Sequence, residues 1–144
     1  MAAPVYAGTS FLVSLYIQDA NSVRAVADAP RLLPLCFTAL LEHELRNAIR
    51  LGVFRRQIVT AQREKALHDI ESDKAAGVLH VVPLDWPKAL KQAEALGRRH
   101  TEALGARGMD ILHVASALAL KAGRFVTFDE RQRELAQLAG LAIH

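Results

Sequence analysis

Three acidic residues stand where the sequence pattern predicts a buried face or the end of a strand. Glu44 emerges from the apolar stripe of a helix predicted over residues 40–51. Asp110 is aligned with the inward face of a later predicted helix, and Asp129 follows an apolar run of strand length. Carboxylates in such places are costly unless a cation or hydrogen-bond donors meet them. Their oxygen atoms suit Mg²⁺ or Mn²⁺, which polarise a phosphate and activate water for hydrolysis.

Each carboxylate also has a purely structural interpretation. Glu44 at the edge of its stripe can reach water or pair with an arginine. Asp110 can serve as the N-cap of its helix. Asp129 is followed three residues later by Gln132, which is the spacing of a capping box. Both interpretations stay open for each residue taken alone.

The predicted elements bring the three carboxylates together. Five apolar runs have strand length: residues 4–7, 33–37, 79–84, 124–128 and 141–143. Helical spacing covers residues 9–17, 40–51, 60–76, a segment capped by Asp85 with Pro87 in its first turn, 110–122 and 130–139. Alternating strands and helices predict an α/β fold with a mostly parallel sheet of about four to five strands, covered on both faces. Because the carboxyl ends of parallel strands form a ligand-binding edge, we expect the three carboxylates to meet there.

Length and composition limit the class of protein. The 144 residues predict one domain over residues 1–144, and 51% hydrophobic with 23% charged residues is typical of an ordinary globular protein. The lone Cys36 excludes a disulfide framework and a cysteine zinc site, which favours the reducing cytoplasm. Residues 1–18 are uncharged but lack a basic start and are interrupted by polar residues, so we expect neither a signal peptide nor a membrane span.

The basic residues are unevenly distributed along the chain. The net charge is only +3, yet residues 45–63 contain five arginines and no acidic residue. This run favours a polyanionic partner such as a nucleic acid. The alternative is a solvated helix face that is basic without a partner.

Four segments in a fixed order resemble one family. They read VYAGTSFLV at 5–13, ELRNA at 44–48, RGMDILHVA at 107–115 and FVTFDERQ at 125–132. Together they resemble the PIN-domain ribonucleases, and most closely the VapC-type toxins of prokaryotic toxin–antitoxin pairs. The resemblance extends over nearly the whole chain and implies a three-layer α/β/α PIN-like domain.

The resemblance implies a Mg²⁺- or Mn²⁺-dependent endoribonuclease that acts on cellular RNA such as tRNA. Its catalytic and metal-binding residues would be Glu44, Asp110 and Asp129. Supporting hydrogen bonds would come from Thr9, Ser10 and Thr127. The basic run and the position of Arg107 three residues before Asp110, and not the resemblance, supply the candidate RNA-binding residues: Arg46, Arg50, Arg55, Arg56 and Arg107. Arg107 can also pair with an acidic residue of the site or be an ordinary loop arginine. Similar toxins are commonly homodimers and are silenced by a VapB-like antitoxin.

The sequence departs from the family pattern at Gly8. The family's first strand ends in an aspartate at this position, ordinarily a central metal ligand. Its loss predicts weak metal binding and impaired hydrolysis. We expect the carboxylate introduced by Gly8→Asp to raise metal-dependent cleavage without altering the core. The alternative is a non-catalytic PIN-like binding module whose acidic pocket only receives an antitoxin segment.

Overall fold

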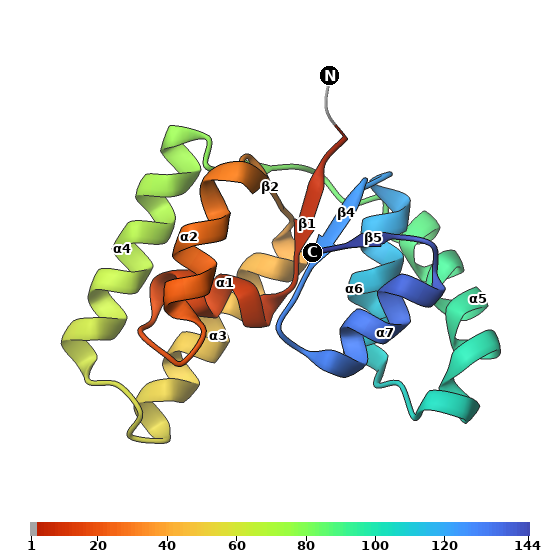
Figure 1. Cartoon of the computed structure of the whole chain (residues 1–144). Coiled ribbons are helices and arrows are strands. Elements are labelled where there is room, and N and C mark those ends of the chain that lie inside the picture. The colour runs from red at the N-terminus through yellow and green to blue at the C-terminus, as the bar shows by residue number, and fades with distance from the viewer. Residues whose placement is uncertain (1–2) are drawn as a thin grey trace. The chain divides into compact units, whose positions relative to one another are not determined.

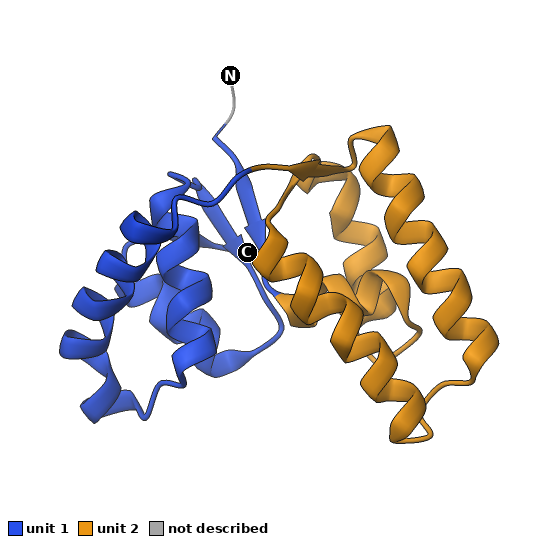
Figure 2. Ribbon diagram, turned by 180° about the vertical axis from the view of Figure 1, so that it is seen from behind, with its two compact units in different colours: residues 1–8, 83–144 blue, residues 9–82 orange. Residues whose placement is uncertain are grey.

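The computed structural model describes residues 3–144, which form seven helices and five strands (Figure 1). The strands are β1 (Val5–Ala7), β2 (Leu35–Phe37), β3 (Leu79–Val81), β4 (Arg124–Val126) and β5 (Ala142–Ile143). The helices are α1 (Thr9–Tyr16), α2 (Ser22–Leu32), α3 (Ala39–Phe54), α4 (Thr60–Ala76), α5 (Trp86–Leu104), α6 (Gly108–Ala119) and α7 (Glu130–Leu138). The chain divides into two units, residues 1–8 with 83–144 and residues 9–82 (Figure 2).

The first unit is built on three parallel strands. β4 pairs with β1 on one side and with β5 on the other, and Tyr6 is opposite Phe125 in this register. The two rings stack with their centroids 5.3 Å apart, and both side chains are fully buried. Helix α6 packs against α5 and α7, and α7 also contacts β4 and β5. Helix α7 is thereby held close to the end of β4.

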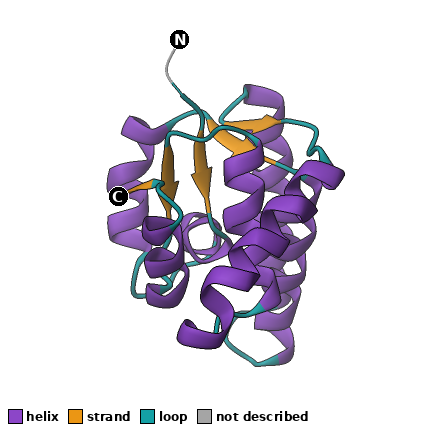
Figure 3. Cartoon of the chain, turned by 90° about the vertical axis from the view of Figure 1, so that its right-hand side faces the viewer, coloured by secondary structure: helices purple, strands orange, loops and turns teal. Residues whose placement is uncertain are grey.

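The second unit pairs β2 with β3 in parallel, with Leu35 opposite Leu79. Helix α1 packs against α2, α3 and α4, and α3 packs against α4. The core of this unit is apolar and includes Phe11, Leu12, Phe37, Leu41, Leu45, Ile49 and Ile70. Cys36 on β2 is a buried free thiol, and burial raises its pKa to about 11. Along the chain, one or two helices follow each of the strands β1, β2, β3 and β4. Figure 3 distinguishes the short strands from the longer helices by colour.

The predicted fold class is confirmed. Each of the five apolar runs contains a strand, and every strand pair described above is parallel. The strands are shorter than the runs, because only two or three residues of each run lie in the ladder. The prediction of a single domain over residues 1–144 stays a prediction; Met1 and Ala2 lie outside the described residues. Within residues 3–144, no helix is long and apolar enough to span a membrane.

The helices differ from the sequence prediction in two places. Helix α2 was not predicted, because its apolar residues Val23 and Val26 are exposed and Pro30 lies inside it. Helix α6 begins at Gly108 with Arg107 as its N-cap residue, so Asp110 lies in the first turn and is not the N-cap. The N-cap interpretation of Asp110 is therefore wrong.

Candidate functional site

Gly8 lies directly after β1, where its buried backbone N–H donates to the Val126 carbonyl at 2.8 Å. Its φ is outside the left-handed region, so the backbone conformation does not require glycine. The surrounding packing requires glycine instead, because a Cβ at this position would lie 2.5 Å from Gln132 Oε1 and 3.4 Å from Thr127 Oγ1. The side chain of Gln132 fills the space that a side chain at position 8 would need.

Gln132 links the end of β4 to α6. Its side chain projects from the first turn of α7 and is 4% exposed. Oε1 accepts a hydrogen bond from Thr127 Oγ1 at 2.8 Å, and Nε2 donates to Asp110 Oδ1 at 3.5 Å. We call Gly8, Asp110, Thr127 and Gln132 the Gln132 cluster. All four belong to the first unit.

Asp129 is the N-cap residue of α7, as one of the two interpretations predicted. Its Oδ1 accepts from the backbone N–H groups of Arg131 at 2.9 Å and Gln132 at 3.1 Å. The other half of the capping box is absent, because the Asp129 N–H donates to Thr127 Oγ1 at 3.0 Å. The Gln132 carboxamide therefore does not cap α7 and instead bonds to Thr127 and Asp110 within the Gln132 cluster.

Glu44 and Thr9 come together in the second unit. Thr9 Oγ1 donates to Glu44 Oε1, which connects the start of α1 to α3. The buried residues of α3 are Leu41, Leu45 and Ile49, and Glu44 is half-buried at the edge of this stripe. Ser10 is also half-buried, and its carbonyl accepts from Ser14 Oγ at 3.1 Å.

The predicted RNA-binding arginines differ in their surroundings. Arg46 is half-buried and forms ion pairs with Glu42, at 2.9 Å, and with Glu71. The other four are exposed and make no ion pair within residues 3–144: Arg50, Arg55, Arg56 and Arg107. Arg46 therefore has a structural role between α3 and α4, whereas the exposed four can reach a ligand.

Glu42 predicts a pH dependence of stability. Burial raises its pKa, but hydrogen bonds from Arg46 and Lys74 outweigh burial, so this pKa lies below the usual glutamate value. A lowered folded pKa stabilises the fold above the unfolded pKa, and this contribution is lost as pH falls through the folded value. We expect Glu42→Gln to be less stable than the native chain at neutral pH and to lose less stability between about pH 5 and 3. Urea denaturation across pH measures this, with the exposed Glu64→Gln as control; parallel curves for native chain and Glu42→Gln would contradict it.

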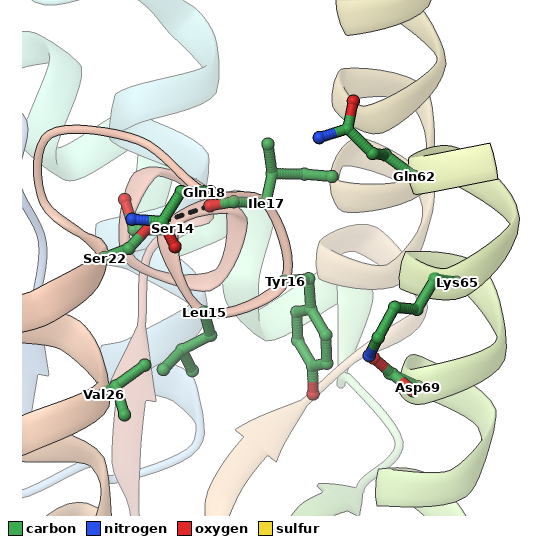
Figure 4. Close-up of a pocket in the computed structure, with 10 residues that line it drawn as sticks. All are labelled: Ser14, Leu15, Tyr16, Ile17, Gln18, Ser22, Val26, Gln62, Lys65 and Asp69. Atoms are coloured by element: carbon green, nitrogen blue, oxygen red, sulfur yellow. Dashed lines mark hydrogen bonds and ion pairs between the residues drawn. The ribbon is translucent and has the colours of Figure 1, made fainter. Parts of the chain in front are cut away.

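A separate cavity of about 270 Å³ lies within the second unit (Figure 4). Lys65 Nζ and Asp69 Oδ2 form an ion pair in its wall at 2.5 Å. The Tyr16 hydroxyl donates to Asp73 at 2.6 Å, and burial and this carboxylate raise the pKa of the phenol. None of the predicted site residues lines this cavity, so it is distinct from the candidate site.

A model of the PIN-domain family matches residues 5–138. The chain belongs to the PIN-domain family. Solved structures with the same fold include FitAcB from Neisseria gonorrhoeae, with 16% identity, coverage of 96% of this chain and 95% of that chain, and a TM-score of 0.68. The VapC20 toxin of Mycobacterium tuberculosis, which cleaves the sarcin–ricin loop, is 18% identical, with 96% of each chain covered and a TM-score of 0.68.

VapBC2 from Rickettsia felis, bound to a DNA fragment from its promoter, is 17% identical to this PIN domain. The match covers 97% of this chain and 96% of that chain, with a TM-score of 0.65. No curated protein sequence matches significantly. Identities this low show a shared fold, so the resemblance to VapC-type PIN domains is confirmed at the level of family and fold. Membership supports a nuclease role for this PIN domain.

The residues of the first unit do not fit the Mg²⁺ or Mn²⁺ implied by the family. Hard cations prefer several oxygen ligands, and carboxylates are the strongest of these. At position 8 there is no side chain, and Asp110 Oδ1 faces an N–H donor of Gln132. Within residues 3–144, no group of three or more His, Cys, Asp or Glu residues is placed to hold a metal ion. The metal-ligand roles of Glu44, Asp110 and Asp129 stay predictions.

Gln132 is the residue that sequence reasoning misplaced. Its spacing from Asp129 indicated a capping box, which would have turned the carboxamide back to the Asp129 N–H. The expectation that Gly8→Asp leaves the core unaltered also needs correction. The new side chain would meet Gln132 Oε1, so the carboxamide must move to admit it.

Proposed function

We propose that this PIN domain is a VapC-like endoribonuclease of the toxin class whose hydrolysis is impaired by Gly8. Family membership over residues 5–138 supports the nuclease role. The neighbour that cleaves the sarcin–ricin loop supports RNA as the substrate class. The observation that carries the impairment is the Gln132 carboxamide, which occupies the space where the family pattern has a carboxylate. Cellular RNA such as tRNA is the proposed substrate.

The proposed roles follow the predicted sites. Asp110 and Asp129 belong to the first unit, whereas Thr9, Ser10 and Glu44 belong to the second unit, where Thr9 donates a hydrogen bond to Glu44. Thr127 holds the Asp129 backbone N–H and the Gln132 carboxamide through its hydroxyl, and its carbonyl accepts from Arg133 Nη2 at 2.9 Å. In an active member, Mg²⁺ or Mn²⁺ would supply charge neutralisation and an activated water. We expect this chain to bind either ion weakly.

The proposed partner is a VapB-like antitoxin, and the proposed setting is the cytoplasm with the chain as a homodimer. The Rickettsia felis neighbour is a VapBC assembly on promoter DNA, which supports an antitoxin partner. An antitoxin with a basic segment would complement the acidic residues of the site. Co-purification of a small basic protein encoded beside this chain tests the partner, and its absence from the purified chain under native expression would contradict the assignment.

RNA binding tests the substrate class without requiring cleavage. The exposed Arg50 and Arg55 lie at the end of α3, and each phosphate contact contributes to the salt dependence of binding. We expect Arg50→Ala with Arg55→Ala to weaken binding of a structured RNA and to lower the slope of log K against log salt by about 2. Filter binding at several salt concentrations measures this slope.

The control for this experiment removes the same charge elsewhere. Lys88 and Lys91 are exposed residues on α5, and replacing both by alanine leaves the α3 arginines in place. We expect the lysine variant to retain nearly the native slope. Equal losses in the two variants would show that the basic run is only a solvated face.

A second candidate function is the non-catalytic binding module. The hydrogen bonds of Gln132 to Thr127 and Asp110 favour it, because they satisfy these groups without a cation. The two candidates differ in one outcome. A module would bind the antitoxin and stay inert even in the double variant Gly8→Asp/Gln132→Ala.

A further inference from the structure

Gln132 and Gly8 form a matched pair in the first unit. The carboxamide oxygen lies 2.5 Å from where a Cβ of residue 8 would be, closer than real Cβ contacts allow. Gln132 is 4% exposed and is anchored by the hydrogen bond from Thr127 Oγ1 at 2.8 Å. A side chain at position 8 must therefore break this hydrogen bond or displace a buried carboxamide, at the cost of overpacking.

The other end of the carboxamide acts on Asp110. Nε2 donates an N–H to Asp110 Oδ1 at 3.5 Å. This hydrogen bond is weak, because N–H···O bonds are typically ~2.7–3.2 Å long. An N–H group directed at a carboxylate oxygen competes with a cation for that oxygen, because both need its lone pairs. The neutral Gln132 carboxamide thus fills the space beside Gly8 and also donates a hydrogen bond to the Asp110 carboxylate.

We infer that Gln132 is a positioning residue that closes the acidic site of the first unit to divalent cations, so that restoring the site requires changes at both position 8 and position 132. The inference deepens the proposed function and relies on it only for the role of the cation. Gly8→Asp alone displaces the carboxamide from Thr127 but keeps its N–H donors beside the acidic residues, where they compete with a cation for oxygen lone pairs. Gln132→Ala alone leaves position 8 without a ligand.

Mn²⁺ binding, measured by calorimetric titration of the full chain with MnCl₂ alone, tests the inference. The native chain, Gly8→Asp, Gln132→Ala and the double variant form a cycle. We expect the double variant to bind Mn²⁺ at least about tenfold more tightly than any of the other three, a size typical of changes to groups around a metal site. Gly8→Asn in the Gln132→Ala background supplies similar volume without charge and should not gain affinity. Equal affinity for Gly8→Asp and the double variant, or no gain in the double variant, would overturn the inference.

A second measurement tests the packing without any metal. Gly8→Ala adds only the Cβ that meets Gln132 Oε1, so we expect it to lower Tm by roughly 3 to 10 °C in the native chain. In the Gln132→Ala background the same methyl group keeps only its contact with Thr127 Oγ1 at 3.4 Å, and the drop should be less than about half as large. Gln137→Ala on the exposed side of α7 is the matched control and should leave the cost of Gly8→Ala unchanged. The same cost in all backgrounds would contradict the pairing.

These readouts separate the inference from the proposed function, because neither uses RNA. If the coupling between positions 8 and 132 is found and the double variant still fails to cut RNA, the proposed function is wrong and the closure by Gln132 stands. If Gly8→Asp alone binds Mn²⁺ as tightly as the double variant and cuts RNA, the closure by Gln132 is wrong and the proposed function stands.

Discussion

The double variant Gly8→Asp/Gln132→Ala should cleave structured RNA in the presence of Mn²⁺ at least about tenfold faster than the native chain. It supplies the missing carboxylate and removes both the atom that would collide with it and the N–H directed at Asp110. Gly8→Asp alone should gain much less. Single-turnover cleavage of end-labelled RNA, followed on gels, measures the rates.

Two control variants test whether the gain in cleavage depends on Asp110 and on the charge at position 8. Asp110→Ala in the repaired background should return cleavage to the native level, because it removes a carboxylate that the restored site needs. Gly8→Asn with Gln132→Ala should stay near the native level, because it restores volume without charge. A repaired chain as inert as the native one, and unchanged by Asp110→Ala, would contradict the nuclease interpretation and leave the binding module.

Replacement of His113 by alanine should lower the free energy of unfolding by about 3 kcal/mol. His113 is 1% exposed, and its Nδ1 lies 2.7 Å from the hydroxyl of the fully buried Tyr6. The variant loses a buried ring and removes the partner of a buried hydroxyl, and both losses destabilise. Tyr6→Phe, which removes only the hydroxyl, should cost about 1 to 2 kcal/mol. Urea denaturation followed by circular dichroism measures both.

His80 offers a matched control for this second prediction. It lies on β3 and is exposed, so His80→Ala should change stability by no more than about 0.5 kcal/mol. A similar loss in His80→Ala and His113→Ala would mean that the buried pair contributes nothing particular. A loss confined to His113 and Tyr6 would assign both residues to the core and not to RNA chemistry.

The strands could be predicted from sequence because buried parallel strands read as short apolar runs. The runs that contain β1 and β4 are examples, and their partners Tyr6 and Phe125 stack in the core. Helix α2 was missed, because its buried residues Ser22, Ala25 and Leu32 include only one large apolar side chain. Its other large apolar residues, Val23 and Val26, are exposed. Local spacing reports burial only when apolar side chains face the core.

The candidate site was predictable in its residue types and less so in its contacts. Asp129 lies after β4 as predicted, and Thr9 meets Glu44. The position of the Gln132 side chain depends on tertiary contacts that sequence spacing does not reveal. The Gln132 carboxamide could accept a hydrogen bond from the Asp129 N–H or pack beside Gly8. The Thr127 hydroxyl accepts from the Asp129 N–H, so the carboxamide does not, and it bonds to Thr127. The absent side chain of Gly8 leaves room for the second of these arrangements.

The buried thiol of Cys36 has a practical consequence. The thiolate is the form that reacts with maleimides, and a pKa of about 11 leaves almost none of it near neutral pH. A cysteine introduced at an exposed position such as Lys88 would then react alone. The native background thus accepts one fluorescent reporter at a chosen place, and encounters with RNA or antitoxin can be followed without first replacing Cys36.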